Sequence, residues 1–180
     1  MSYRYNNLAF SLSHSYYKIF DSRYNNLNLS GDYYLSSNYS IKNDKLNINY
    51  SLGLKIPNRS SDISTKEFDY FGFLNLNYNL NKKQNIYASY GYTLTGKSDS
   101  KNYSSLSIGS DYMLSDDWQI SLTYNYNGST YDNINNYRSI SIGNYYKLSD
   151  KLFMKFRYDR GLDDNSYKNA FSLSLGAVFE

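Results

Sequence analysis

The stretch that decides the fold is residues 112–126, YMLSDDWQISLTYNY. From Trp118 onward, apolar or aromatic residues alternate strictly with polar residues. Successive side chains of a β-strand point to opposite faces, so this period of two predicts a strand with one apolar and one polar face. The cluster Ser115-Asp116-Asp117 has the composition of a turn, and Tyr112 and Leu114 continue the alternation before it. The stretch therefore predicts a β-hairpin.

A similar hairpin pattern recurs along the chain. Its first tyrosines, at positions 33, 78, 112 and 146, are separated by 45, 34 and 34 residues. A repeat of this length fits two strands, one longer loop and one tight polar turn. The first tight turn has two candidate positions, because 36–38 and 42–45 both have turn composition. We expect an extended turn or bulge within 36–45.

Alternation continues over most of the chain and predicts ten strands joined in turn by tight turns and longer loops. The expected strands are residues 4–16, 24–36, 46–56, 68–81, 85–96, 103–115, 118–126, 137–149, 152–160 and 169–179. No segment has the apolar period of a helix. We expect a single all-β domain over residues 1–180, an antiparallel up-and-down sheet closed into a barrel.

Composition excludes several classes of protein. The 180 residues include 24 Tyr and no Cys, so disulfides and thiolate metal sites are excluded. A net charge of +3 is too mild to indicate nucleic-acid binding. No apolar run approaches the ~18 residues of a membrane-spanning helix. We expect no metal and no cofactor.

The beginning of the chain lacks the pattern of a signal peptide. Met1 is followed directly by Ser-Tyr-Arg-Tyr-Asn-Asn, without an apolar stretch. If the protein is exported, we expect this chain to be a mature form or one domain of a longer protein.

Alternation alone does not say which face of the sheet lies inside. In a soluble barrel or sandwich the apolar face is the core, whereas in a membrane barrel it meets lipid. Aromatic residues on the apolar face near the tight turns favour lipid, because Tyr and Trp concentrate at membrane interfaces. These residues are Tyr33, Tyr78, Tyr112, Trp118 and Tyr146. The polar face is rich in Ser and Gly, which suits a narrow interior. A soluble barrel remains the alternative fold, and a folded monomer without detergent would support it.

The last expected strand ends AFSLSLGAVFE, with Phe171, Leu173, Leu175 and Phe179 on one face. This pattern resembles the C-terminal signal strand of bacterial outer-membrane β-barrel proteins. The family pattern ends on the aromatic residue itself, whereas Glu180 follows Phe179 here. The resemblance implies an integral outer-membrane location, insertion by the barrel-assembly machinery, tight turns in the periplasm and longer loops outside.

Charged residues are expected on the inner face of such a barrel. They are Asp32, Lys55, Asp69, Asp111, Lys147, Lys155, Arg157 and Asp159. Charges in a narrow interior need partners or water, so they predict either a hydrated mixed-charge lining or a salt-bridge network that plugs the barrel. Ten strands give a backbone diameter of roughly 20 Å, between filled and open barrels. Inward Ser and Gly favour an open interior. Five inward aromatic residues favour a closed one: Tyr34, Phe71, Phe73, Tyr145 and Phe153.

The function that these patterns favour is a narrow, weakly selective, passive pore for ions and small polar solutes, acting as a monomer. The alternative is a non-conducting structural or adhesive barrel, or the C-terminal membrane anchor of a larger export protein. An enzyme is not expected, because His14 is the only histidine and no catalytic motif accompanies it.

Overall fold

The computed structural model is one antiparallel sheet of eleven strands that follow one another in chain order. It describes residues 2–19, 27–59, 66–131, 134–164, 166 and 168–177. The strands are β1 (Ser2–Tyr5), β2 (Leu8–Ile19), β3 (Leu27–Lys42), β4 (Leu46–Ile56), β5 (Asp69–Asn79), β6 (Gln84–Leu94), β7 (Tyr103–Ser115), β8 (Trp118–Asn127), β9 (Tyr137–Lys147), β10 (Leu152–Gly161) and β11 (Asn169–Ala177). In these described residues, no helix is long and apolar enough to cross a membrane.

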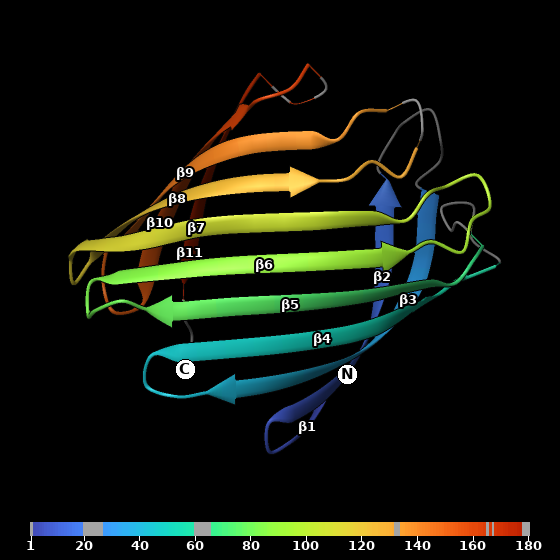
Figure 1. The fold of residues 1–180 in the computed structure, drawn as a ribbon, viewed down its shortest axis with the longest axis horizontal. Helices are drawn as coiled ribbons and strands as arrows, with labels where there is room; N and C mark the ends of the chain where they lie inside the picture. Colours follow the sequence, from blue (N-terminus) through green and yellow to red (C-terminus); the bar gives the residue numbers. More distant parts are fainter. Residues whose placement is uncertain are drawn as a thin grey trace.

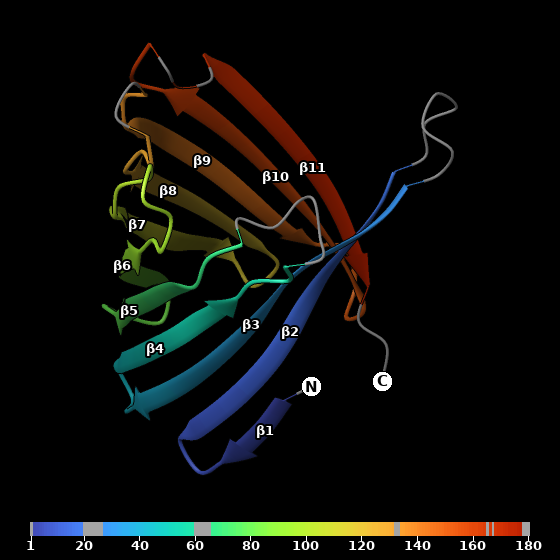
Figure 2. The same ribbon diagram turned by 90° about the vertical axis from the view of Figure 1, so that its right-hand side faces the viewer.

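The sheet curves into a shell but does not close. Figures 1 and 2 show β4–β9 as its front wall, with both ends of the sheet, β2–β3 and β10–β11, behind that wall. Among the described residues, β11 pairs only with β10, and the other edge ends at β1 and β2. The predicted all-β, antiparallel, up-and-down arrangement is confirmed. The predicted closure is not: this sheet is open.

The eleventh strand comes from a turn that the periodicity analysis missed. Asn6 has a φ of 50°, in the left-handed region that Asn tolerates better than most residues. The chain reverses there, so that Tyr5 pairs with Leu8 and the expected strand 4–16 becomes two strands. The prediction of ten strands was therefore wrong by one short strand. β1 also explains part of the open edge, because it pairs with residues 8–11 of β2, where a closing strand would lie.

The ambiguous region 36–45 is mostly strand. β3 runs through 36–38 to Lys42, so the expected end at residue 36 was wrong, and residues 24–26 lie outside the described residues. Asn38 stays in the strand because its side chain accepts a hydrogen bond from Ser51 on β4, at 2.5 Å. The turn forms at Asn43, whose Oδ1 accepts the backbone N–H groups of Lys45 at 3.1 Å and Leu46 at 2.7 Å.

The turn at Asn43 shows how the four repeated hairpins align in the sequence. In the tight turns of four hairpins, β3–β4, β5–β6, β7–β8 and β9–β10, a side-chain oxygen accepts a backbone N–H from two residues further along. The four accepting residues are Asn43, Asn81, Ser115 and Ser149. They are separated by 38, 34 and 34 residues. Tyr33 does not belong with the other turn-end tyrosines, because it pairs with Ile56 at the opposite, loop end of the sheet. Its predicted place beside a tight turn was wrong.

Removing one of these turn acceptors gives a direct test of the turn assignment. Asn81 Oδ1 accepts the N–H groups of Lys83 at 2.8 Å and Gln84 at 2.9 Å. We expect Asn81→Ala to lower the free energy of unfolding by about 1 kcal/mol, the value of a typical hydrogen bond exchanged for water. The exposed neighbour Lys82→Ala is the control. Equal effects of the two variants in urea titrations would contradict the assignment.

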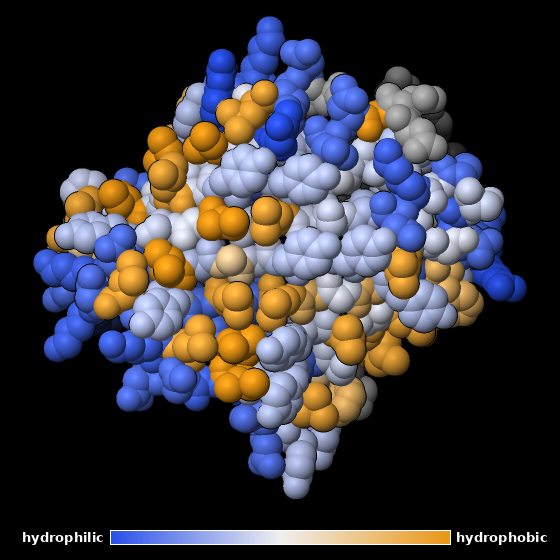
Figure 3. All heavy atoms as spheres, in the orientation of Figure 1, coloured by the Kyte–Doolittle hydropathy of each residue, from blue (hydrophilic) through white to orange (hydrophobic). Residues whose placement is uncertain are grey.

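The polarity of the sheet is inverted relative to a soluble barrel. Among the described residues, no apolar side chains form a buried core, and the buried side chains other than Pro57 are polar or charged. The convex outer face carries exposed apolar residues such as Leu52, Leu122 and Ile142, with exposed fractions of 68%, 57% and 52%. Figure 3 shows apolar and tyrosine side chains across this face, with hydrophilic groups toward the turn and loop margins. Strands β5–β10 have 10 to 13 residues, enough to cross a bilayer when tilted.

Candidate functional site

The candidate functional site is the polar inner face of the shell. Strand periodicity places Ser, Asn, Thr and charged residues on this concave side, opposite the apolar outer face. Its most buried members are Asp32, Lys55, Thr93, Ser139 and Ser141, with exposed fractions between 1% and 8%. Buried polar and charged groups are stable only when they have hydrogen-bond or ion-pair partners. The contacts among these side chains therefore determine the chemical character of the inner face.

The first cluster is an ionic triad at the loop end of β3, β4 and β5. Lys55 and Asp69 are direct cross-strand partners and form an ion pair. Lys55 Nζ also lies 3.9 Å from Asp32 Oδ2. The side chains of Lys55 and Asp32 are 7% and 8% exposed, and that of Asp69 is 18% exposed. The sequence placed these three residues on the inner face, and the structure brings them together.

The triad also holds two outer loops against the strands. Asp32 Oδ1 accepts the backbone N–H of Asn58, in the loop after β4, at 3.0 Å. Asp69 Oδ1 accepts the N–H of Gly96, in the loop after β6, at 2.9 Å. Each carboxylate therefore has one oxygen directed toward Lys55 and the other bound to a loop. The triad fixes the loop-end entrance of the inner face.

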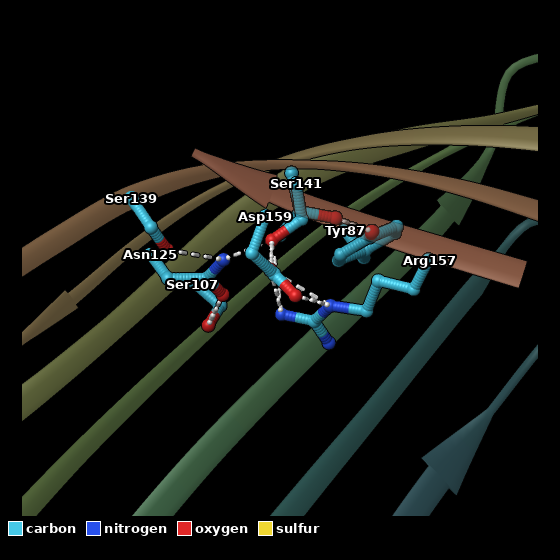
Figure 4. A network of polar contacts seen from close by, with 8 residues as sticks. Tyr87, Ser107, Asn125, Ser139, Ser141, Arg157 and Asp159 are labelled. Atoms are coloured by element: carbon cyan, nitrogen blue, oxygen red, sulfur yellow. Dashed lines mark hydrogen bonds and ion pairs between the residues drawn. The ribbon is translucent and has the colours of Figure 1, made fainter. Parts of the chain in front are cut away.

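The second cluster is a hydrogen-bonded network across β7–β10 (Figure 4). Arg157 Nε donates to both oxygens of Asp159, at 2.9 and 3.0 Å, and Arg157 Nη2 donates to Ser141 Oγ at 2.9 Å. Ser141 Oγ in turn donates to Asp159. Asn125 Nδ2 donates to Ser141 Oγ at 2.9 Å. Arg157 and Asp159, both expected on the inner face, form an internally neutral pair.

Paired Ser and Asn side chains extend this pattern along the wall. Ser107 Oγ donates to Asn125 Oδ1 at 2.9 Å, and Ser89 Oγ donates to Asn75 Oδ1 at 2.6 Å. Ser40 Oγ makes the same bond to Asn49 Oδ1 at 2.6 Å. These pairs join facing positions of adjacent strands, where cross-strand side chains meet. Sequence reasoning noted the small polar residues but missed the pairing, whose signal is Ser and Asn at facing positions of successive hairpins.

The inward aromatic rings lie along the wall. A Cβ atom added to Gly53 would overlap the ring of its cross-strand partner Phe71. Phe73 lies over Gly91, Tyr87 over Gly109 and Phe153 over Gly176 in the same way. A glycine without a side chain leaves room for a ring from the next strand. The prediction that inward aromatic residues favour a closed interior therefore loses its support at Phe71, Phe73 and Phe153.

Filling one of these spaces should move a ring off the wall. The space above Gly176 holds only the Phe153 ring, without a backbone neighbour among the three nearest atoms. We expect Gly176→Val to displace this ring inward, to lower the free energy of unfolding by about 1–3 kcal/mol, and to lower any ion conductance. The double variant G176V/F153A should recover both quantities, measured by urea titration and in planar bilayers. No recovery would mean that the glycine serves another purpose.

The remaining inner-face charges stand apart from both clusters. Asp111 lies on β7, with its Oδ2 3.5 Å from Asn85 Nδ2. Lys147 Nζ binds Asp150 Oδ1 in a tight turn at 2.7 Å, so it belongs to the turn-end rim. Lys155 Nζ lies over the rings of Phe153 and Tyr145, 5.1 and 5.9 Å from their centroids. The wall thus combines neutral pairs with a few separate charges.

A polar cavity of about 590 Å³ opens at the loop rim beside β9 and β10. Arg138 and Asp163 line it, and Arg138 Nε donates to the two carboxylate oxygens at 2.9 and 3.0 Å. The hydrogen bonds from Arg138 lower the pKa of Asp163 below its ordinary value, so this carboxylate takes up a proton at a lower pH than an ordinary Asp does. The Arg138 side chain is 53% exposed, so solvent screens this ion pair and limits its contribution to stability.

The aromatic residues expected at a membrane interface lie on the outer face near the tight turns, Tyr33 excepted. Trp118 and Tyr146 are cross-strand partners, 41% and 42% exposed. Trp118 Nε1 donates a hydrogen bond to Asn144 Oδ1 at 2.8 Å. The indole therefore has a polar partner, and it also lies beside its cross-strand partner Tyr146 on the outer face. On β11, Phe171, Leu173 and Leu175 are 70%, 66% and 74% exposed. Phe179 lies outside the described residues.

His14 belongs to a contact at the loop end of β2 and β3. Its Nε2 lies 2.9 Å from Ser30 Oγ, and its ring stacks on Tyr33 with centroids 4.5 Å apart. Asn58 Nδ2 donates to the same hydroxyl at 2.9 Å. Over the described ranges, no group of three or more His, Asp or Glu side chains is placed to hold a metal ion.

Comparison with known proteins identifies the fold but no sequence family. No protein-family model matches the chain, and no curated protein matches its sequence. A similar solved structure is that of the toluene transporter TbuX of Ralstonia pickettii, at 11% sequence identity and a TM-score of 0.53. The match covers 86% of this chain and 46% of the transporter, so the chain spans about half the length of that protein. The chain is therefore an eleven-stranded, up-and-down antiparallel sheet that resembles an outer-membrane barrel fold.

Proposed function

We propose that the protein forms a narrow, hydrated, weakly selective passage through a bacterial outer membrane for ions and small polar solutes. The observation that carries this proposal is the inverted polarity, with exposed leucines and isoleucines outside and buried Ser, Asp and Lys inside. An exposed apolar belt is costly in water and favourable in lipid. A polar inner wall is favourable where water fills the interior.

The composition of the wall argues for polar solutes and weak selectivity. The Ser–Asn pairs satisfy one another, and Arg157 and Asp159 neutralise one another. A wall of this kind offers hydrogen bonds without a strong field of one sign. The structural neighbour is named a toluene transporter, and its likeness to this chain concerns the fold. The polar lining supports a different class of solute here.

A passage requires the sheet to close, and the strand directions permit it. Neighbouring strands are antiparallel throughout, so β2 and β11 run in opposite directions. We propose that they pair in the membrane, because an open sheet edge at membrane depth leaves backbone groups unsatisfied. Beyond residue 11, β2 offers an edge that β1 does not cover.

Engineered disulfides test this closure. The chain has no Cys, so a pair of substitutions gives an unambiguous crosslink. Ser13 on β2 and Ser172 or Ser174 on β11 share the inner face. We expect Ser13→Cys to crosslink with one of the two β11 positions in lipid vesicles, because facing strands bring Cα atoms to within about 5.5 Å. Failure of both pairs in folded, inserted protein would exclude the two registers in which residue 13 faces residue 172 or 174.

Single-channel recording tests the passage itself. We expect refolded protein to give discrete conductance steps in a planar bilayer, and Lys155→Glu to shift the reversal potential toward cation preference. Lys155 is suited to this test because it is exposed on the inner face and is in contact with aromatic rings. Silence from protein shown to be folded and inserted would overturn the proposed passage.

The second candidate is a non-conducting barrel or membrane anchor within a larger protein. Two observations favour it: the described sheet has free edges, and the chain spans 46% of its structural neighbour. In that case other strands would complete the wall. Silence in bilayers together with failure of the disulfides would support this candidate.

A further inference from the structure

An apolar groove of about 390 Å³ lies on the outer face of the sheet, across β4 to β7. It forms at Ala88 of β6, whose side chain is a single methyl group. The cross-strand partners of Ala88 are the larger residues Leu76 and Ile108, which form the sides of the groove. Exposed apolar depressions are typical binding sites for apolar groups. The lining residues on this face are Leu46, Leu76, Tyr78, Ile86, Ala88 and Ile108.

The groove extends toward the tight turns of the β3–β4 and β5–β6 hairpins. Leu46 directly follows Lys45, and Ile86 comes three residues after Lys83. At about 3.3 Å per residue, the near end of the groove is within about 10 Å of both turns. The two turns are roughly 10 Å apart, the width of two strand spacings, and Figure 1 shows them next to each other at the left margin. A ligand in the groove therefore has its outer end between these turns.

These two turns are basic, whereas the other two tight turns are not. Residues 42–45 and 81–83 hold four lysines and one acid, a formal charge of +3, and residues 115–117 and 147–151 together have a charge of −1. All four lysines are exposed, and no ion pair within the described part of the chain involves any of them. Figure 3 shows hydrophilic side chains along this margin, next to the apolar face. Their positive charge is therefore available to an anionic ligand. The lysines are Lys42, Lys45, Lys82 and Lys83.

We propose that the groove and the two basic turns form one binding site for an anionic phospholipid. One acyl chain lies in the groove along Ala88, and the phosphate group lies among Lys45, Lys82 and Lys83. Lysines close to a membrane surface attract anionic headgroups, and the adjoining apolar groove fixes the position of the chain. The inference rests on the membrane location in the proposed function, because the outer face must meet lipid. It adds a defined lipid site to the general contact that an apolar outer face makes with a bilayer.

Tryptophan quenching by brominated phospholipids measures lipid binding at this site. Tyr78→Trp in the W118F background places the only indole at the groove. The wild-type protein is the matched reporter, because Trp118 lies on the outer face directly after the acidic turn 115–117. The vesicles contain phosphatidylglycerol and phosphatidylcholine, with bromine on one lipid at a time. We expect the Tyr78→Trp reporter to bind phosphatidylglycerol about fivefold more tightly than phosphatidylcholine, and Trp118 to show no such preference.

Two variants of the Tyr78→Trp reporter separate the charge from the groove. K82Q/K83Q removes two exposed charges and should abolish most of the preference, whereas Lys151→Gln, in the β9–β10 turn, should leave it unchanged. Ala88→Phe fills the groove and retains every lysine, so it should at least halve the preference. Ile142→Phe, on the outer face of β9 away from the groove, is its control.

The outcomes distinguish this site from the proposed passage. Equal binding of the two lipids at the Tyr78→Trp reporter, or a preference that survives K82Q/K83Q, would overturn the site. Absence of quenching at this reporter alone would also overturn it, since protein, such as a second copy of the chain, would then cover the groove. Absence of quenching at both reporters would reject the lipid-facing outer wall and with it the passage. A lipid preference in protein that does not conduct would retain the site and reject the passage.

Discussion

Lys55→Met is expected to lower the free energy of unfolding by about 3–5 kcal/mol, because it leaves the buried carboxylates of Asp32 and Asp69 without their shared cation. Removing one partner of a buried ionic cluster lowers the free energy of unfolding by more than the intact cluster contributes to it, because the remaining charges stay buried without compensation. The measurement is urea unfolding of the protein folded in lipid vesicles.

Lys147→Met is the matched control for this prediction. Lys147 also forms an ion pair with an aspartate, but its partner Asp150 is 94% exposed. An exposed pair contributes between about 0 and 1 kcal/mol, so this variant should be nearly neutral. Similar losses for the two variants would show that the triad is hydrated, and the described entrance would then be wrong.

Leu122→Arg is expected to lower the free energy of unfolding by about 2–4 kcal/mol in vesicles, the cost of a cation near the middle of a bilayer. Leu122 lies mid-strand on β8, on the outer face, between Ser110 and Ile142 of the neighbouring strands. In a soluble barrel the same exposed position would tolerate Arg within about 0.5 kcal/mol.

The control for Leu122→Arg uses the depth dependence of a bilayer. Leu148 is also apolar and 52% exposed, but it lies next to the tight turn at Ser149. Leu148→Arg should cost between about 0 and 1 kcal/mol, as expected near an interface. Equal and small costs at both positions would favour the soluble barrel over the membrane barrel.

Much of the fold follows from local patterns that a single sequence shows. Period-two alternation located β4 to β11 to within a few residues, because a half-buried strand repeats its polarity at every step. Two errors came from asparagine. Asn6 reverses the chain with a left-handed φ, and Asn38 stays in β3 although its neighbours have turn composition. Whether Asn makes a turn or a cross-strand bond depends on the partner strand.

The candidate site was predicted only in part, because register decides which inner-face residues meet. Strand phase placed Asp32, Lys55 and Asp69 on the inner face. Their contact depends on the pairing of Lys55 with Asp69 across β4 and β5, which the sequence does not specify. The Gly–aromatic contacts depend on the same register, as Gly53 must face Phe71. A shift of one residue would remove both features.

The orientation of the two faces is the central claim, and tryptophan quenching in lipid vesicles tests it most directly. The protein has one Trp, so W118F gives a background without indole fluorescence. Leu173→Trp and Ser174→Trp then place one indole on each face of β11, at positions where both side chains are exposed. We expect lipids brominated on their acyl chains to quench the Leu173→Trp protein strongly and the Ser174→Trp protein weakly, with the reverse order for aqueous acrylamide. Stronger lipid quenching at 174, or equal quenching at both positions, would contradict a lipid-facing apolar wall and a water-facing polar one.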